Sequence, residues 1–245
     1  MNYISHFRDW LLDIIFPMRC IECGRFNNDK FYGYMCDKCL GLIRLNRSFE
    51  CIGCKKEVSL GKTCYFCRDS NHIDQLLVAA DYNDFNVSRA LKLVKYHFIS
   101  DIIRPLSAIM KEYVQWLNSG RHLNIFVGKP IIVPIPLHGT RYNWRGFNQS
   151  ELLAKLVAED FQAEFSSELM ARVRRSTPQA EITERDERLK NTSELFRVLN
   201  PDLVFGRTIL LVDDVCTTGA TLNEAARVLK LSGATKVIGL VVARG

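Results

Sequence analysis

The sequence predicts an α/β protein in which a mostly parallel sheet is flanked by helices and follows a small cysteine-rich domain. Eight of the nine cysteines lie before residue 68, in four Cys-x-x-Cys pairs. Beyond residue 72, strand-like apolar runs alternate with helical patterns, which is typical of a parallel sheet covered on both faces. A chain of 245 residues can bury a domain-sized core and still carry a small satellite domain. We therefore expect two domains, residues 1–72 and 73–245.

Composition and charge exclude several classes of protein. The chain is 47% hydrophobic and 24% charged, which is ordinary for a globular protein and excludes collagen, coiled-coil arrays and full disorder. Its 33 basic and 27 acidic residues give a net charge of +6, a mild excess that is compatible with polyphosphate or nucleic-acid partners. No run reaches the roughly 18 apolar residues of a transmembrane helix. The N-terminus has no basic leader or cleavage site, so we expect a cytoplasmic protein.

The N-terminal residues predict a short amphipathic helix. Leu11, Leu12, Ile14 and Ile15 suit one face of such a helix, and Pro17 ends it. We expect this helix to pack on its own protein, with a membrane surface or a partner as the alternative.

The four cysteine pairs predict structural zinc sites. In a reducing cytoplasm, paired knuckles supply the four thiolates of a closed tetrahedral site. Gaps of 12 and 9 residues favour two consecutive zinc ribbons, although spacing alone also allows an interleaved pairing and therefore one or two ions. A redox role for one pair is the less economical reading. The expected zinc ligands are Cys20, Cys23, Cys36, Cys39, Cys51, Cys54, Cys64 and Cys67.

Basic and aromatic residues are interleaved with these cysteines. Lys55, Lys56 and Lys62 lie close to Tyr65 and Phe66, a combination that can bind single-stranded nucleic acid. The alternative is a small domain that uses its aromatic residues for packing and its lysines for solubility.

The rest of the chain contains alternating elements. The patterns predict helices at Asn86–Tyr96, Ile103–Leu117, Gln149–Phe161 and Thr221–Leu231. They predict strands at Gln75–Tyr82, Ile131–Ile135, Leu169–Val173, Phe196–Leu199, Thr208–Val212 and Lys236–Val242. Ligands of such sheets bind at the carboxyl ends of the strands.

One of those strand ends carries an anion-binding pattern. Asp213 and Asp214 follow a buried strand, and Thr217, Thr218 and Thr221 lead into a helix. Backbone amides, threonine hydroxyls and the helix N-terminus can bind a phosphate together, and Gly219 allows close approach. Two carboxylates beside a phosphate site require hydroxyl donors or a magnesium ion on the ligand. A sugar phosphate meets both requirements.

The segment from Val212 to Thr221 resembles the phosphoribosyl-pyrophosphate (PRPP) signature of type I phosphoribosyltransferases. The chain as a whole is similar to the ComF family of competence proteins. The similarity is carried by Val133-Pro134-Ile135-Pro136-Leu137-His138, Arg141, Arg145-Gly146-Phe147-Asn148-Gln149, Arg175, Gln179, Arg185, Arg188, Asn191 and Phe196. It extends to Phe16-Pro17, Cys20, Cys23-Gly24, Leu93 and Lys95-Tyr96. The resemblance implies a type I phosphoribosyltransferase-like domain behind a double zinc ribbon.

The resemblance also implies a binding site and a reaction. Magnesium-bound PRPP would be held by Asp213, Asp214, Val215, Cys216, Thr217, Thr218, Gly219, Ala220 and Thr221, with Arg141, Arg145 and Arg175 toward the pyrophosphate. Asp213, Asp214 and Arg145 would be the catalytic residues of a phosphoribosyl transfer. The segment from Arg172 to Lys190 would close over the site. His138 would assist the pyrophosphate loop.

The family implies a role in single-stranded DNA uptake or DNA metabolism, with helicase or recombination proteins as partners. The alternative is a PRPP- or nucleotide-binding module without chemistry that binds nucleic acid or an uptake partner, because no base-recognition pocket is evident. Cys216, at a helix N-terminus, is a weak candidate nucleophile.

Overall fold

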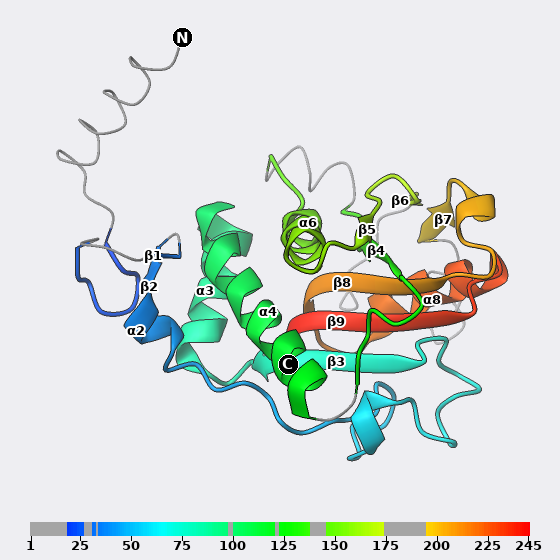
Figure 1. The fold of residues 1–245 in the computed structure, drawn as a ribbon, viewed down its shortest axis with the longest axis horizontal. Helices are drawn as coiled ribbons and strands as arrows, with labels where there is room; N and C mark the ends of the chain where they lie inside the picture. Colours follow the sequence, from blue (N-terminus) through cyan, green and yellow to red (C-terminus); the bar gives the residue numbers. More distant parts are fainter. Residues whose placement is uncertain are drawn as a thin grey trace, which may run out of the picture.

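The structure, a computed structural model, describes residues 19–26, 31–32, 34–97, 100–120, 123–137, 146–173 and 195–245. Its centre is a five-stranded sheet in the order β3-β9-β8-β4-β5, in which every neighbouring pair is parallel (Figure 1). The strands are β3 (Gln75–Asp81), β4 (Ile131–Pro134), β5 (Glu164–Phe165), β8 (Thr208–Cys216) and β9 (Lys236–Arg244). The expected parallel sheet is confirmed.

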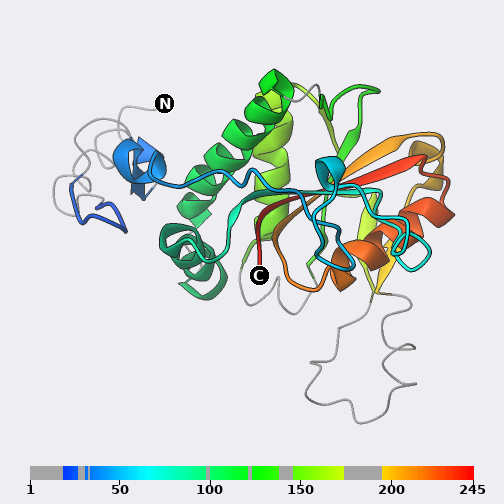
Figure 2. The same ribbon diagram turned by 90° about the horizontal axis from the view of Figure 1, so that it is seen from below.

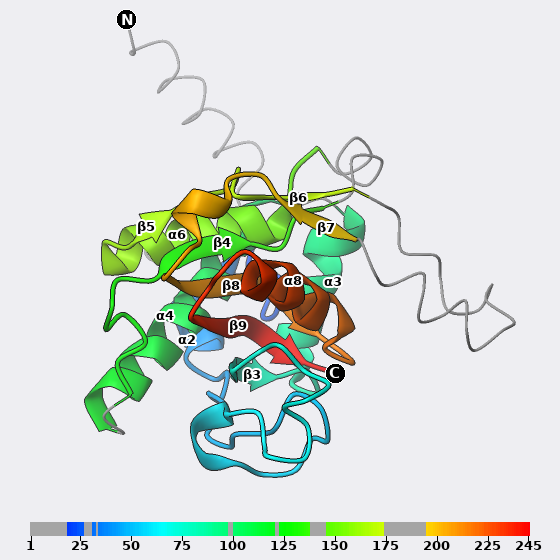
Figure 3. The same ribbon diagram turned by 90° about the vertical axis from the view of Figure 1, so that its right-hand side faces the viewer.

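Helices cover both faces of this sheet, as the sequence predicts. The long helices are α3 (Phe85–His97), α4 (Ile103–Gly120), α6 (Gln149–Phe161) and α8 (Ala220–Leu231). Single 3-10 turns lie at Ser59–Gly61, Ser100–Ile102 and Pro201–Leu203. Helices α3, α4 and α6 pack on one face and α8 on the other (Figure 3).

Alternation along the strands separates the two cores. Leu77 and Ala79 of β3 face the core beneath α3, α4 and α6, whereas Leu76 and Val78 face the core beneath α8. Because successive side chains of a strand point to opposite faces, nearly every residue of β3 and β9 is buried. The resulting near-continuous apolar runs are what made these strands readable in the sequence.

Two of the expected strands lie outside the main sheet. β6 (Met170–Arg172) and β7 (Phe196–Val198) pair antiparallel as a separate two-stranded sheet. β5 is too short to have been predicted; it extends the main sheet through parallel pairing with β4.

The cysteine-rich region forms two separate bodies. The first contains β1 (Phe31–Tyr32), β2 (Met35–Cys36) and α2 (Asp37–Leu40) and lies beside α3 at one end of the molecule (Figures 1 and 2). A linker then runs along the edge strand β3. Leu45 forms an isolated antiparallel β-bridge with Ala80, and the Asn46 N–H donates to the Ala79 carbonyl. The second body follows and lies against the sheet (Figure 2). The helix expected at residues 11–16 lies outside the described residues.

Within the part of the chain that the structure describes, no helix is both long enough and apolar enough to span a membrane.

Candidate functional site

A cavity of about 550 Å³ opens where the carboxyl ends of β4 and β8 meet the N-termini of α6 and α8. Parallel strands bring their carboxyl ends to one edge, so residues distant in sequence meet there. The cavity is lined by Lys95, Tyr96, Ile135, Pro136, Leu137, Gln149, Ser150, Arg172, Asp213, Asp214, Val215, Thr217 and Thr221.

Strand β8 is longer than predicted, and the two acids belong to it. The pattern suggested an end at Val212, but pairing with β9 continues through Cys216. Asp213 and Asp214 therefore sit on regular backbone at the strand's end rather than on a loop. Such a position is more rigid than a loop and suits a binding site.

Helix α6 supplies hydrogen-bond donors to both carboxylates. Ser150 Oγ donates to Asp213 Oδ1 over 2.6 Å, and Gln149 Nε2 donates to Asp214 Oδ2 over 3.2 Å. Asn148 caps this helix by accepting from the Ser150 N–H. Sequence reasoning did not assign a role to Ser150. The available signal was its place in the first turn of a helix whose N-terminus follows β4.

A lysine of α3 forms an ion pair with one of the two acids. Lys95 Nζ lies 3.1 Å from Asp214 Oδ1, and the Asp214 side chain is only 6% exposed. The backbone N–H of Asp214 donates to Asp213 Oδ1 over 2.9 Å. Lys95, one of the residues that carry the family resemblance, lines the cavity beside these acids.

Asp213 is held in an environment that disfavours its ionised form. Burial and the adjacent charge of Asp214 raise the pKa of its carboxyl from 3.8 to about 7. Hydrogen bonds from Ser150 and the Asp214 N–H, together with the Lys95 charge, act in the opposite direction. Two crowded carboxylates of this kind favour a ligand that brings hydroxyl donors or a cation.

The residues that follow β8 line another side of the cavity. Gly219 is the N-cap of α8, with φ at +81°, and it has no side chain to accept from the first-turn N–H groups. Thr217 and Thr221 line the cavity, and Thr218 Oγ1 accepts from the Ala220 N–H. First-turn amides at a helix N-terminus together with threonine hydroxyls suit a phosphate.

The surroundings of Cys216 disfavour the thiolate that a nucleophile needs. The residue is buried, and burial raises the pKa of its thiol to about 11. The group is therefore a neutral thiol near neutral pH, packed in the core beneath α8.

Several predicted residues lie outside the described residues. These are His138, Arg141, Arg145 and Arg175, with most of the segment expected to close over the site. Arg172, at the start of that segment, lines the cavity, and its guanidinium carbon lies 5.4 Å from the Phe196 ring centroid.

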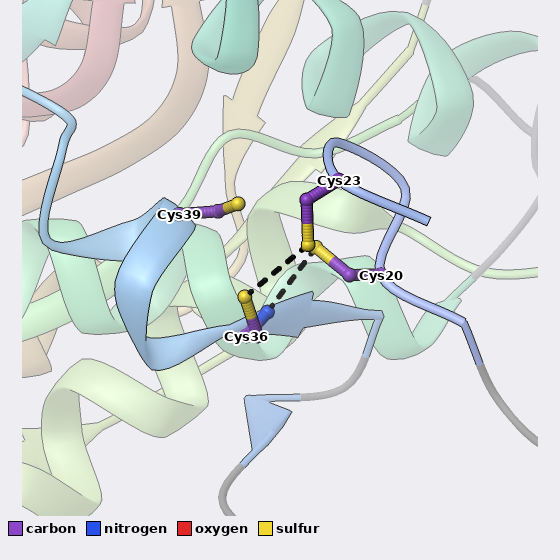
Figure 4. Close-up of side chains that lie close together, drawn as sticks. All are labelled: Cys20, Cys23, Cys36 and Cys39. Carbon is purple, nitrogen blue, oxygen red and sulfur yellow. Dashed lines mark hydrogen bonds between the residues drawn. The ribbon is translucent and has the colours of Figure 1, made fainter. Parts of the chain in front are cut away.

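The eight paired cysteines form two clusters, and their grouping is consecutive rather than interleaved. The first comprises Cys20, Cys23, Cys36 and Cys39 (Figure 4). The second comprises Cys51, Cys54, Cys64 and Cys67, and within each cluster the sulfurs lie within 4.8 Å of one another. The Cys23–Cys36 and Cys54–Cys64 sulfurs are 3.8 Å apart. A tetrahedron with Zn–S bonds of about 2.3 Å places its sulfurs at about this separation.

Backbone N–H groups favour the thiolate form of one cysteine in each cluster. Burial raises the pKa of the Cys51 thiol, but N–H donors of Cys64, Cys54 and Gly53 lower it to about 6. The Cys64 N–H lies 3.4 Å from Cys51 Sγ, and the Cys36 N–H lies 3.5 Å from Cys20 Sγ. The clusters are thus alike in donor set and geometry, and both fit zinc.

Comparison with known proteins agrees with this fold. The phosphoribosyl transferase domain model matches residues 148–245. Competence protein F of Haemophilus influenzae is 26% identical over 84% of this chain and 95% of its own length. DNA utilization protein YhgH of Salmonella typhimurium is 39% identical over 66% of this chain and 69% of its own length.

Among solved structures, glutamine phosphoribosylpyrophosphate (PRPP) amidotransferase from B. subtilis, complexed with ADP and GMP, gives a TM-score of 0.40 at 16% identity. The match covers 62% of this chain and 30% of that one.

Proposed function

This chain belongs to the ComF family of competence proteins, and from that premise we propose that it binds PRPP with magnesium and transfers the phosphoribosyl group during the handling of single-stranded DNA. One observation carries the proposal. Asp213 and Asp214 share a single cavity with Thr217 and Thr221 at the N-terminus of α8. Groups that can accept from sugar hydroxyls and groups that can bind a phosphate therefore line the same cavity.

Each wall of the cavity suits one part of the ligand. Asp213 and Asp214 accept hydrogen bonds from the ribose 2- and 3-hydroxyls. The amides and hydroxyls of residues 217–221 bind the 5-phosphate. The residues after β4, from Ile135 onward, face the pyrophosphate, with Arg141 and Arg145 as its predicted partners in the segment that follows.

Ser150, Gln149 and Lys95 hold the acids in position for this task. Their hydrogen bonds and charge fix both carboxylates before ligand arrives, which reduces the ordering that binding requires. An oxygen-rich site with two crowded carboxylates is compatible with magnesium, which when bound with PRPP neutralises charge on the leaving pyrophosphate.

In the transfer, the bond between ribose C1 and the pyrophosphate oxygen breaks, and pyrophosphate leaves with the electron pair. A nucleophilic nitrogen or oxygen of the acceptor attacks C1 from the opposite face, and its proton passes to solvent. The site stabilises the charge that grows on the leaving group.

The test is calorimetric titration of magnesium PRPP into the zinc-loaded full chain. We expect saturable heat from the native protein and none from the Asp213→Asn/Asp214→Asn double variant. No heat at millimolar PRPP, an affinity weaker than about −4 kcal/mol, would refute the proposal. Pyrophosphate release in the presence of candidate acceptors, single-stranded DNA among them, then separates transfer from binding without chemistry.

A second activity, single-stranded DNA binding, is favoured by one surface feature. In the second cysteine cluster's 64–67 knuckle, Tyr65 is 67% exposed and Phe66 is 91% exposed. The Arg68 guanidinium carbon lies 4.1 Å from the Tyr65 ring centroid. Exposed aromatic rings beside cations are a surface on which bases stack.

Its test is DNA affinity measured across salt concentrations. We expect Phe66→Ala to weaken binding of a short single strand about fivefold or more. We expect Lys62→Gln to reduce the salt dependence. Unchanged affinity in both variants would remove this knuckle as the DNA site.

A further inference from the structure

The second cysteine cluster touches the phosphate-binding segment directly. Ile52 lies between Cys51 and Cys54, within the first knuckle of that cluster, and is 1% exposed. A Cβ atom at position 219 would lie 2.7 Å from Ile52 Cγ1 and 3.0 Å from its Cδ1. The Ile52 side chain therefore packs directly on the backbone of Gly219, the N-cap of α8.

This contact is part of a continuous apolar core. Ile52, Ile73, Cys216 and Leu222 belong to the same buried cluster beneath α8. The end of β8, the first turn of α8 and the knuckle therefore pack as one unit. Close-packed interiors transmit displacement because they have little free volume, so a shift of the knuckle moves the backbone at Gly219.

Polar contacts tie the knuckle to the sheet. Arg244, which pairs with Cys216 in the β8–β9 register, donates to the Cys51 carbonyl over 3.0 Å and to the Ile52 carbonyl over 2.7 Å. Its side chain is 7% exposed. The knuckle backbone is thereby fixed to the last residues of β9 beside the site.

Hydrogen bonds also join the residues that follow the second knuckle of this cluster to α8. Asn223 Oδ1 accepts from the His72 N–H, and Asn223 Nδ2 donates to the Ser70 carbonyl over 3.1 Å. Both residues follow closely on the ligand Cys67. Asn223 belongs to the first turns of α8, so this helix is held to the cluster on two sides.

The first cluster has no comparable contact among the described residues. Its buried members pack in the opposite core, beside α3 and α4. Glu22, in its first knuckle, pairs with Arg89 of α3 over 3.7 Å, and this ion pair does not reach residues 217–221.

We propose that Ile52 is a positioning residue for the 5-phosphate of PRPP, and that the metal-loaded second cluster, through Ile52, holds residues 217–221 in their binding conformation. The inference rests on the proposed function. The two clusters would then differ in purpose, with the second coupled to ligand affinity and the first not coupled.

The first experiment uses two fragments of the ligand as probes. Ribose 5-phosphate and magnesium pyrophosphate are titrated separately into zinc-loaded protein. We expect Ile52→Ala to weaken ribose 5-phosphate binding about fivefold or more and to leave pyrophosphate binding within about twofold. Ile52→Val keeps a γ-carbon against Gly219 and should restore most of the affinity. Equal losses for both fragments, or no loss for either, would overturn the proposal.

The second experiment needs no ligand, so it separates this inference from the proposed function. Cys36→Ser and Cys64→Ser are matched, because each residue is a cluster ligand whose N–H faces the sulfur of its cluster's first cysteine. Hydrogen exchange is followed in peptides covering residues 217–226, with zinc content measured alongside.

We expect one zinc ion to be lost in each variant, and exchange in that segment to accelerate about tenfold or more in Cys64→Ser only. Similar exchange in the two variants would overturn the coupling. If the native protein binds no PRPP while Cys64→Ser still shows the acceleration, the proposed function fails and the mechanical coupling holds.

Discussion

Replacing Asp213 with asparagine should stabilise the fold while it removes a carboxylate that we propose binds the ligand. The folded-state pKa of this carboxyl is about 7, against 3.8 for the free group, so ionisation is harder in the folded state. The destabilisation is absent when both states are protonated, below about pH 4. It grows as the pH rises from 4 to 7 and is complete above pH 7.

The structure sets the size of the effect. A pKa rise from 3.8 to about 7 corresponds to about 4 kcal/mol at 1.36 kcal/mol for each tenfold change in proton affinity. Asp213 is only half-buried, so solvent screens part of this, and we expect a gain of about 2 kcal/mol at pH 8. Asparagine keeps an oxygen that can accept from Ser150 Oγ, so the hydrogen bond survives.

The assay is denaturant unfolding of zinc-loaded native and Asp213→Asn proteins at pH 5.5, 6.5 and 8. The difference in the free energy of unfolding should increase with pH. Asp69→Asn is the control, because that side chain is 94% exposed and solvent screens its charge, so the substitution should change the free energy of unfolding little. A gain for Asp213→Asn that is constant or shrinks as the pH rises would refute the reasoning.

Two further predictions concern Lys95 and Gly61. Lys95→Met removes the cation that lowers the pKa of Asp213, so it should destabilise the fold more at pH 8 than at pH 5.5 in the same unfolding assay. Equal losses at both pH values would contradict this. Gly61→Ala would place a Cβ 2.1 Å from the Leu76 carbonyl oxygen at a φ of +73°, so we expect a loss of about 2 kcal/mol or more. Gly120→Ala, with nothing within 4 Å, should be nearly neutral or stabilising; a similar loss there would show that the Gly61 contact is not the cause.

Local signals made most of the fold readable from the sequence. The predicted helix at Gln149–Phe161 has those bounds in the structure, because Asn148 is a strong N-cap and the apolar period is regular. The end of β8 was placed four residues too early. Aspartate is disfavoured in strands, and only pairing with β9, a contact remote in sequence, keeps Asp213 and Asp214 extended.

The candidate site likewise combines residues that are close in sequence with residues that only the fold brings together. Asp213, Asp214 and the threonines lie in one short segment, so their juxtaposition is visible in the sequence. Ser150 reaches Asp213 from 63 positions away, and Ile52 contacts Gly219 from a different body of the fold. No periodicity or spacing encodes such contacts, because they follow from how the sheet and the second cluster pack.

The arrangement around Asp213 also indicates why this site is present. A fold gains nothing from two adjacent carboxylates when burial, together with the charge of Asp214, raises the pKa of Asp213 to about 7. The surrounding groups, Ser150, Gln149 and Lys95, reduce that cost without removing it. Strain of this kind persists where a ligand makes use of it. The ligand that we propose, a magnesium-bound sugar phosphate, would supply hydroxyl donors and positive charge to these acids and an anion to the adjacent helix N-terminus.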